Sequence, residues 1–365
     1  MLRPVFISLF VFFLHLTSKT QNSYSDVAFA GTSYAALTDT LRLNTDQTQF
    51  ENSLSISKLH STKKAGKITL GYSRSLRSVD AWYFPGSSDK KALVIGGMHG
   101  SELSSIEIAE RLIRELEKGV QPYYSVVIIP SLFPDNASVA RRACVGRTSN
   151  LGRYTSDLHA DPNRQLPPLG VAYHAGHAVD LHGRDIEFEN QLLLQLIQEY
   201  RPSRIVNLHA IKDETKAGFF ADPRTDCGGL ALGFQSDSTL ATALARYVAS
   251  SGGSVPGNHL STNPTVLYHN DPPVAGKGEV QQRNLKGSCI SKSRGYGVSL
   301  GSWATTAVCD DKESRPAMRL ITAEFPGYRS SDQYPSAERS SRKSNIEMYA
   351  FAINTIFLGL IEIED

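Results

Sequence analysis

Apolar positions along the chain follow two different spacings. Runs of adjacent apolar residues, typical of buried strands, occupy 68–72, 81–84, 93–95 and 126–129. Apolar residues that recur every three or four positions, typical of helices, occupy 102–118, 187–200, 240–250 and 344–361. Strands that alternate with helices predict an α/β fold with a mixed, largely parallel central sheet and helices on both faces. Ser101 is the expected N-cap of the first helix.

Polar side chains that bind metals stand at the ends of three apolar runs. His99 and Glu102 follow one run, His209 ends a second and Glu324 ends a third. In open α/β sheets, ligands bind beyond the carboxyl ends of the strands. Zinc takes nitrogen and oxygen ligands, and a hydrolytic zinc site keeps one position open for water. The sequence therefore predicts one zinc ion, with His209 as the third protein ligand beside His99 and Glu102.

Composition narrows the class of protein. The chain has 365 residues, 41% of them hydrophobic, so it can bury a large core as one catalytic domain or as two smaller ones. Its net charge is +2 and the charged residues are interspersed. Because no basic stripe is present, we exclude nucleic acid as the main partner.

The N-terminus has the pattern of a secretory signal. Arg3 precedes an apolar run at 5–16, and polar residues follow. The run is shorter than the roughly 20 apolar residues of a membrane span, so we expect no stable membrane insertion after signal removal. An uncleaved anchor, and cleavage after 28–30 instead of near 17–21, stay open alternatives.

These patterns predict three segments. We expect a signal peptide at 1–21, a lead-in segment rich in Ser, Thr, Asn and Gln at 22–60, and a catalytic domain at 61–365. The predicted location is the periplasm or the cell exterior.

Four cysteines permit two disulfides in an exported chain. Their wide spacing argues against a structural zinc knot. Cys289 and Cys309 flank the segment 295–304 and would close it, which leaves Cys144 and Cys227 as the second pair. Alternatively, some of the four are free buried thiols.

Four motifs in a fixed order carry a family resemblance. They are the His99-x-x-Glu102 pair, Asp161-Pro-Asn163-Arg164, His209, and Glu324 within Thr-Ala-Glu-Phe-Pro. In this order the chain, over roughly 67–361, resembles the zinc metallocarboxypeptidase family, which implies a carboxypeptidase A-like fold. The segment 297–304 and the Thr-Ala-Glu-Phe-Pro ending look most like the bacterial branch of murein peptide amidases, or γ-D-glutamyl-diaminopimelate peptidases.

The resemblance implies a role for each metal-site residue. His99, Glu102 and His209 would hold the zinc ion, and Glu324 would be the general base that takes a proton from water and passes it to the leaving amine. Asp161 matches the carboxylate that orients the first zinc histidine. Alternatively, Asp161 is an aspartate that forms a turn before Pro162.

The same resemblance implies groups that bind the substrate. Asn163 and Arg164 match the pair that grips a terminal carboxylate. Arg147, sixteen residues before Asn163, suits the family spacing for the oxyanion-stabilising arginine, with Arg153 and Arg142 as competitors. Tyr296 is the nearest candidate for the family's mobile tyrosine.

The leading hypothesis is an exported zinc metallocarboxypeptidase that hydrolyses an amide bond next to a free carboxylate. Its expected partner is a peptide or muropeptide from peptidoglycan stem peptides. One alternative is an N-acyl amino acid deacylase of the aspartoacylase or succinylglutamate desuccinylase type, which the signal segment and the long loops at 225–310 disfavour. Another is a non-catalytic peptide-binding relative, which the presence of all four metal-site residues disfavours.

Overall fold

The computed structural model describes residues 56–142, 151–155, 160–175, 178–260, 296–310 and 313–359. The chain divides into two units, 1–44 and 45–365, and every described residue belongs to the second. The predicted signal peptide therefore lies outside the described residues, as does nearly all of the lead-in segment.

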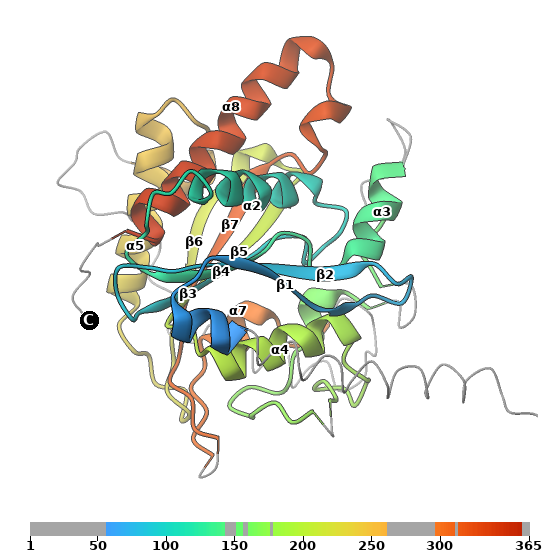
Figure 1. The fold of residues 1–365 in the computed structure, drawn as a ribbon, viewed down its shortest axis with the longest axis vertical. Helices are drawn as coiled ribbons and strands as arrows, with labels where there is room; N and C mark the ends of the chain where they lie inside the picture. The colour runs from blue at the N-terminus through green and yellow to red at the C-terminus, as the bar shows by residue number, and fades with distance from the viewer. Residues whose placement is uncertain are drawn as a thin grey trace, which may run out of the picture. The chain divides into compact units, whose positions relative to one another are not determined.

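A seven-stranded mixed sheet forms the centre of this unit (Figure 1). Its order is β1-β2-β4-β3-β5-β7-β6, and the four central strands β4, β3, β5 and β7 are parallel, while β1, β2 and β6 pair antiparallel. The predicted mixed sheet is thus confirmed. The strands are β1 (Gly66–Tyr72), β2 (Ser78–Phe84), β3 (Lys91–Ile95), β4 (Ser125–Ile129), β5 (Arg204–Ile211), β6 (Gly218–Asp222) and β7 (Arg319–Pro326).

Helices cover both faces of the sheet, as predicted (Figure 1). One face carries α2 (Leu103–Leu116), α5 (Phe234–Ser250) and α8 (Ser336–Ala352), and the other carries α4 (Phe188–Tyr200) and α7 (Leu300–Ala304). The remaining helical segments are residues 56–62, α3 (Pro134–Arg142), η1 (Pro162–Arg164), η2 (Glu214–Lys216), η3 (Pro256–Asn258), η4 (Ser331–Gln333) and η5 (Ile353–Phe357). No helix of the described residues is long and apolar enough to cross a membrane.

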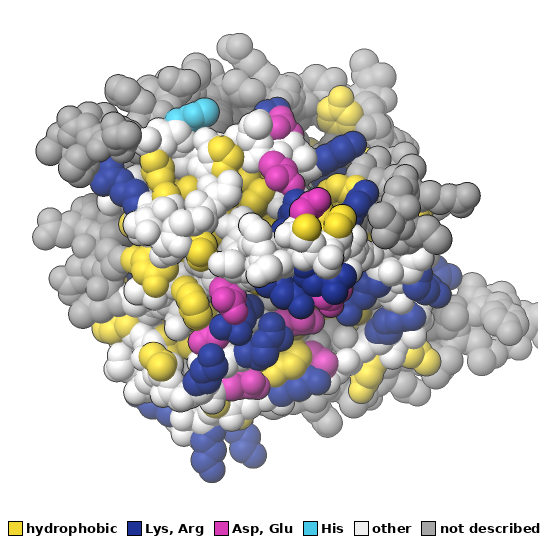
Figure 2. All heavy atoms as spheres, turned by 90° about the horizontal axis from the view of Figure 1, so that it is seen from above, with side chains coloured by type: hydrophobic (Ala, Val, Ile, Leu, Met, Phe, Trp, Pro, Cys, Tyr) yellow, Lys and Arg dark blue, Asp and Glu magenta, His cyan; other side chains and the backbone are white. Residues whose placement is uncertain are grey.

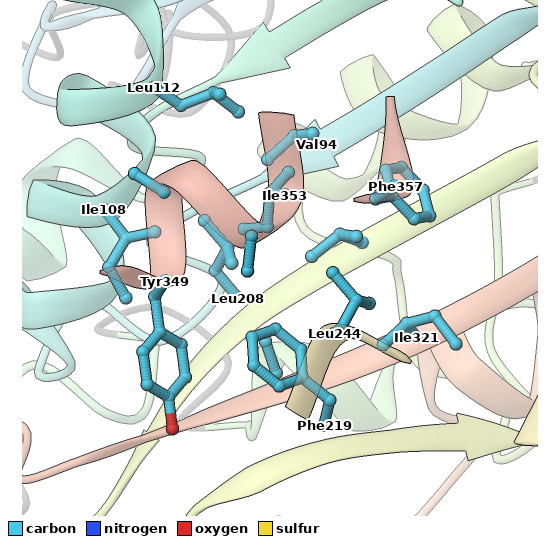
Figure 3. Close-up of a cluster of buried hydrophobic side chains, with 14 of the residues drawn as sticks. Val94, Ile108, Leu112, Leu208, Phe219, Leu244, Ile321, Tyr349, Ile353 and Phe357 are labelled. Carbon is cyan, nitrogen blue, oxygen red and sulfur yellow. The ribbon is translucent and has the colours of Figure 1, made fainter. Parts of the chain in front are cut away.

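Alternation along the strands divides the core into two layers. In β3, Val94 packs with α2, α5 and α8, whereas its neighbours Leu93 and Ile95 pack with α4 and α7. Figure 3 shows the first layer, in which Tyr349 of α8 and Phe219 of β6 stack with ring centroids 4.9 Å apart. Both faces of the central strands are therefore buried, which explains why these strands read as continuous apolar runs.

Two helices begin earlier than the apolar spacing predicts. Helix α5 begins at Phe234 instead of 240, and its first turns contain the buried carboxylate Asp237, which pairs with Arg224 and Arg319. Helix α8 begins at Ser336 instead of 344, and its first turns are mostly exposed. The first turns of both helices lack an apolar stripe, so the spacing of apolar residues does not reveal where these helices begin.

The predicted disulfide pairing is wrong for Cys227 and Cys309. These two cysteines pair with each other, with Cα atoms 5.9 Å apart, instead of with Cys144 and Cys289, which lie outside the described residues. The reason is a contact between distant segments: the Thr225 amide donates to the Thr305 carbonyl at 2.9 Å, and the Ala307 amide donates to the Thr225 carbonyl at 3.0 Å. The spacing of the cysteines along the sequence does not predict that contact.

Charged side chains of both signs are interspersed on the surface seen from above in Figure 2. This matches the interspersed charges of the sequence. On that face, lysine and arginine lie beside aspartate and glutamate instead of forming a separate basic stripe.

Candidate metal centre and active site

The carboxyl ends of three neighbouring parallel strands bring the predicted metal-site residues together. His99 lies four residues beyond β3, while His209 and Glu324 each lie two residues before the end of β5 and β7. His209 and Glu324 are partners in the register of these two strands. The expectation that the three strand ends meet at one edge of the sheet is therefore confirmed.

A tight turn after β3 brings His99 and Glu102 into the interior. Gly97 has φ +64°, in the left-handed region that favours glycine, and a Cβ on Gly96 would lie 2.5 Å from the Pro130 carbonyl oxygen. Glu102, not Ser101, occupies the N-cap of α2, and its side chain makes no capping bond. Its carboxylate is instead directed at the two histidines. The prediction of Ser101 as the N-cap is wrong, because the helix begins one residue later than that cap requires.

Glu102 bridges the two histidines. Its Oε1 lies 2.8 Å from His99 Nδ1, and its Oε2 lies 2.9 Å from His209 Nδ1. The three side chains are at most 5% exposed, and one donor atom from each lies within 4.8 Å of the others. Zinc bonds to nitrogen and oxygen are about 2.0–2.2 Å long, so donors on one ion lie within roughly twice that distance. The arrangement fits a zinc ion with small movements of the side chains.

Asp161 contacts the first histidine from its far side. Asp161 Oδ1 lies 2.8 Å from His99 Nε2 and also accepts a hydrogen bond of 2.9 Å from the Asn163 amide. Asp161 was interpreted either as a carboxylate that orients the first histidine or as a turn-forming aspartate. The structure shows both contacts, one to His99 and one within the turn. A carboxylate on Nε2 holds the ring so that Nδ1 faces the other donors.

Asn207 contacts the second histidine and was not predicted. Its Nδ2 lies 2.9 Å from His209 Nε2, and its Oδ1 is buried with no hydrogen-bond partner among the described residues. The oxygen and nitrogen of an amide are assigned from their contacts. Rotation of the Asn207 amide would place Oδ1 against the histidine, which would then donate from Nε2 and leave the Nδ1 lone pair for a metal.

Burial and charge shift the pKa values of the group. Burial alone would lower the pKa of His99, but the carboxylates of Glu102 and Asp161 outweigh it and raise the pKa to about 9. Burial would raise the pKa of Asp161, but the bond from His99 and the Arg153 charge lower it to about 2. Burial likewise opposes ionisation of Glu102, yet the two histidines hold its pKa well below the ordinary value.

Glu324 shows the opposite shift. Burial raises the pKa of its carboxyl, and Glu102 raises it further against the attraction of His209 and His99. Glu324 thus holds a proton more readily than an exposed glutamate does, which suits a group that accepts and returns a proton.

Of the three arginines considered for the oxyanion role, Arg153 reaches the site. Its Nη1 donates to Glu102 Oε1 at 2.9 Å, and its Nη2 donates to Asp161 Oδ2 at 3.3 Å. Arg147 lies outside the described residues. Arg142 is exposed at the end of α3, where it donates to the Ser138 carbonyl of its own helix.

Asn163 and Arg164 lie in η1, beside the metal group. Asn163 Nδ2 is 3.4 Å from His209 Nε2, and Asn163 Oδ1 accepts a hydrogen bond of 2.9 Å from the Leu300 amide, at the start of α7. The Ser299 side chain caps this helix by accepting from the Ser302 amide at 3.1 Å. The Arg164 Nη1 donates to the Asn163 carbonyl at 2.6 Å. The structure therefore places the predicted carboxylate-binding pair next to the predicted metal ligands.

Tyr296 lies apart from these contacts. Its side chain is 47% exposed, and its carbonyl accepts a hydrogen bond of 2.9 Å from Arg184 Nη2. Among the described residues, no hydrogen bond joins its hydroxyl to the metal group. The role expected for Tyr296 stays a prediction.

The chain resembles several solved structures in fold, but it matches no known family or curated protein by sequence. No protein-family model and no curated protein matches the chain. A proposed metallopeptidase from Shewanella amazonensis matches with 16% identity over 86% of this chain and 94% of its own, at a TM-score of 0.44. A proposed succinylglutamate desuccinylase or aspartoacylase from Shewanella frigidimarina matches with 14% identity over 82% and 73%, at a TM-score of 0.41. The murein-tripeptide amidase of Escherichia coli O157 matches with 19% identity over 77% and 92%, at a TM-score of 0.37. Likenesses at such low identities concern the fold alone.

Proposed function

We propose that the protein is a zinc-dependent metallohydrolase of the carboxypeptidase type, which cleaves an amide bond next to a free carboxylate. The observation that carries this proposal is the convergence of buried His99, Glu102 and His209, with Glu324 in register beside His209. A metal held by these three groups would keep one coordination position for water. Glu324, a carboxyl of raised pKa, interacts with the same three side chains and suits a general base.

Each group then has a defined task. A zinc ion held by His99, Glu102 and His209 would supply a water of lowered pKa and would polarise the carbonyl of the scissile bond. Glu324 would take a proton from water and pass it to the leaving amine. Asn163 and Arg164 bind the free carboxylate of the substrate and so set its position. Arg153 donates two hydrogen bonds to the carboxylates around His99, and its charge stabilises negative charge that develops on the substrate.

The substrate that we propose is a peptidoglycan stem peptide, and the location is outside the cytoplasm. Two observations support an exported protein: the signal-like N-terminal pattern and the Cys227–Cys309 disulfide, since disulfides persist in oxidising compartments. A wall peptide with a free carboxylate would meet an exported enzyme there.

The experiment combines metal analysis with product identification. The purified protein is assayed for zinc content, and its digest of soluble muropeptides is analysed by mass spectrometry. His209→Ala removes a predicted ligand, while His174→Ala, an exposed histidine, is the matched control. We expect stoichiometric zinc and a product lighter by one residue or short unit, both lost only in His209→Ala.

Other results would revise the proposal in a defined way. Zinc without cleavage of muropeptides moves the search to ordinary peptides and to N-acyl amino acids, whose free carboxylate also suits Arg164. Absence of zinc from the wild-type protein overturns the proposal and favours a peptide-binding role.

A further inference from the structure

A large cavity lies at the end of the sheet opposite the candidate site. Its volume is about 1100 Å³, just above the roughly 300–1,000 Å³ of pockets that hold small organic molecules. Lys91, Arg204 and Arg319, which line it, are the first residues of β3, β5 and β7. The candidate metal centre lies at the other end of the same strands. None of its residues lines the cavity, so the two places are distinct.

The wall of the cavity is strongly cationic. Seven lysines and arginines line it, against three carboxylates: Lys90, Lys91, Arg201, Arg204, Arg224, Arg315 and Arg319, with Asp89, Glu199 and Glu313. Asp237 pairs with two of these cations, at 2.8 Å from Arg224 and 2.5 Å from Arg319. The other five form no ion pair with a carboxylate of the described residues.

Two of these unpaired cations are held by neutral groups. Arg204 is 3% exposed; its guanidinium donates to the Phe357 carbonyl at 2.5 Å and to the Tyr124 hydroxyl, and it lies 3.5 Å from the centre of the Tyr124 ring. Arg315 donates to the carbonyls of Trp303 and Ala304, each at 2.9 Å. Such bonds satisfy the donors but leave the positive charge uncompensated, which is costly when the charge is buried.

Burial is the main reason why two cations in the wall of the cavity have lowered pKa values. Burial lowers the pKa of Arg315 to about 10. Burial and the neighbouring Arg201 lower the pKa of Lys91, although Asp89 opposes this. A negative charge bound in the cavity would favour the charged form of both groups and so raise both pKa values again.

A purely structural role explains only part of this arrangement. Arg315 caps carbonyls at the end of α7, and Arg204 caps a carbonyl of η5. Neither task requires Lys90, Lys91 and Arg201 to line the same cavity. Trp303, Tyr173 and Met318 also border the cavity, but each is at most 3% exposed, so they lie just beneath its wall.

We propose that this cavity is a second binding site, which takes a small organic anion with an apolar frame and at least two negative charges on carboxylate or phosphate groups. The charges would face Lys91, Arg201 and the buried arginines, and the frame would lie against the wall that covers Trp303.

Trp303 provides the reporter for the test. The chain has two tryptophans, and Trp82→Phe leaves Trp303 as the only one. In this background the probes propane-1,2,3-tricarboxylate and phenyl phosphate are titrated by fluorescence. We expect a saturable change with a Kd below about 1 mM at low ionic strength, and clearly weaker binding in about 0.5 M NaCl. The tighter of the two probes identifies the carboxylate or the phosphate source. The neutral propane-1,2,3-tricarboxamide should not bind.

Three variants locate the bound anion. Lys91→Gln with Arg201→Gln should raise the Kd at least about tenfold. Lys67→Gln with Lys118→Gln removes the same charge elsewhere and should change the Kd less than about twofold. Arg164→Gln should leave it unchanged. The proposal is overturned if neither probe saturates, if the two double variants weaken binding equally, or if Arg164→Gln abolishes it, which would place the anion in the candidate active site.

Discussion

His209 and Glu324 face each other across the parallel pair β5 and β7, as partners in the strand register. Residues in register on adjacent strands project from the same face of the sheet. The separation of a predicted metal ligand and the predicted general base is therefore set by backbone hydrogen bonds. Such placement on strands is more exact than placement on loops.

Glu324→Gln tests the general base. The amide has the same shape but cannot take a proton from water, so we expect full zinc content and a kcat about 10²–10⁴-fold lower. Metal analysis and steady-state kinetics measure the two quantities on one preparation. Glu338→Gln, an exposed position in α8, serves as the control. Unchanged kcat in Glu324→Gln would remove this residue as the base.

Arg164→Ala tests recognition of the terminal carboxylate. A hydrogen bond to a charged group contributes about 1.5–3 kcal/mol, so kcat/KM for a substrate with a free carboxylate should fall about ten- to hundredfold. The same substrate as its carboxamide should lose much less. Arg142→Ala removes an exposed arginine of α3 and should change neither value. Equal losses on acid and amide substrates would contradict a carboxylate clamp.

Zinc affinity should depend on pH through His99. In the metal-free protein its pKa is raised to about 9, so the imidazole is charged at neutral pH and must lose a proton before Nδ1 can bind zinc. The apparent affinity should therefore rise about tenfold per pH unit from near neutrality up to about pH 9. Competition with a chelator at several pH values measures this slope, and an affinity that does not change with pH would contradict it.

The raised pKa of His99 also determines how the stability of the metal-free protein changes with pH. A raised pKa means that the folded state favours the charged His99. This contribution is complete below the unfolded value of 6.5 and is lost as the pH rises through about 9. Urea unfolding of chelator-treated protein between these limits should show the decrease, whereas the zinc-loaded protein should not.

The disulfide can be checked directly. A digest without reductant should contain one peptide pair that joins Cys227 to Cys309. The double variant Cys227→Ser with Cys309→Ser should lower the free energy of unfolding by about 2–5 kcal/mol, since the unfolded chain regains the freedom of a long loop. Reduced wild-type protein is the comparison and should unfold like the variant. A Cys289–Cys309 peptide would contradict the structure.

The parts of the fold that follow from sequence are those with local signals. Central strands such as β4 are buried on both faces, so they read as apolar runs, and α2 shows its apolar face at helical spacing. The meeting of His99 and His209 was predictable because parallel strands end at one edge of a sheet. The early start of α5 was not, since its first turn is held by the Arg319–Asp237 ion pair with a distant strand.

Residues that act through distant contacts were missed, or were not preferred, on sequence alone. Asn207 could have been noticed as an amide within an apolar run, two residues before His209 and so on the same face of the strand. Arg153 was named from the sequence only as a competitor of Arg147, because nothing in a stretch of several arginines without periodicity singles it out. Its contacts with Glu102 and Asp161 do. The Cys227–Cys309 pair depends on a bridge between Thr225 and Thr306, which is formed only in the folded chain.

The disulfide also determines whether a single proteolytic cut can separate the chain into two fragments. Cys227 and Cys309 are 82 residues apart, between the strands that carry His209 and Glu324. A single cut anywhere in that stretch leaves both fragments covalently joined, so the nicked protein keeps its mass apart from one added water. Nicked and intact molecules would separate by size only after reduction, and the two halves of the candidate site would stay on one molecule until then.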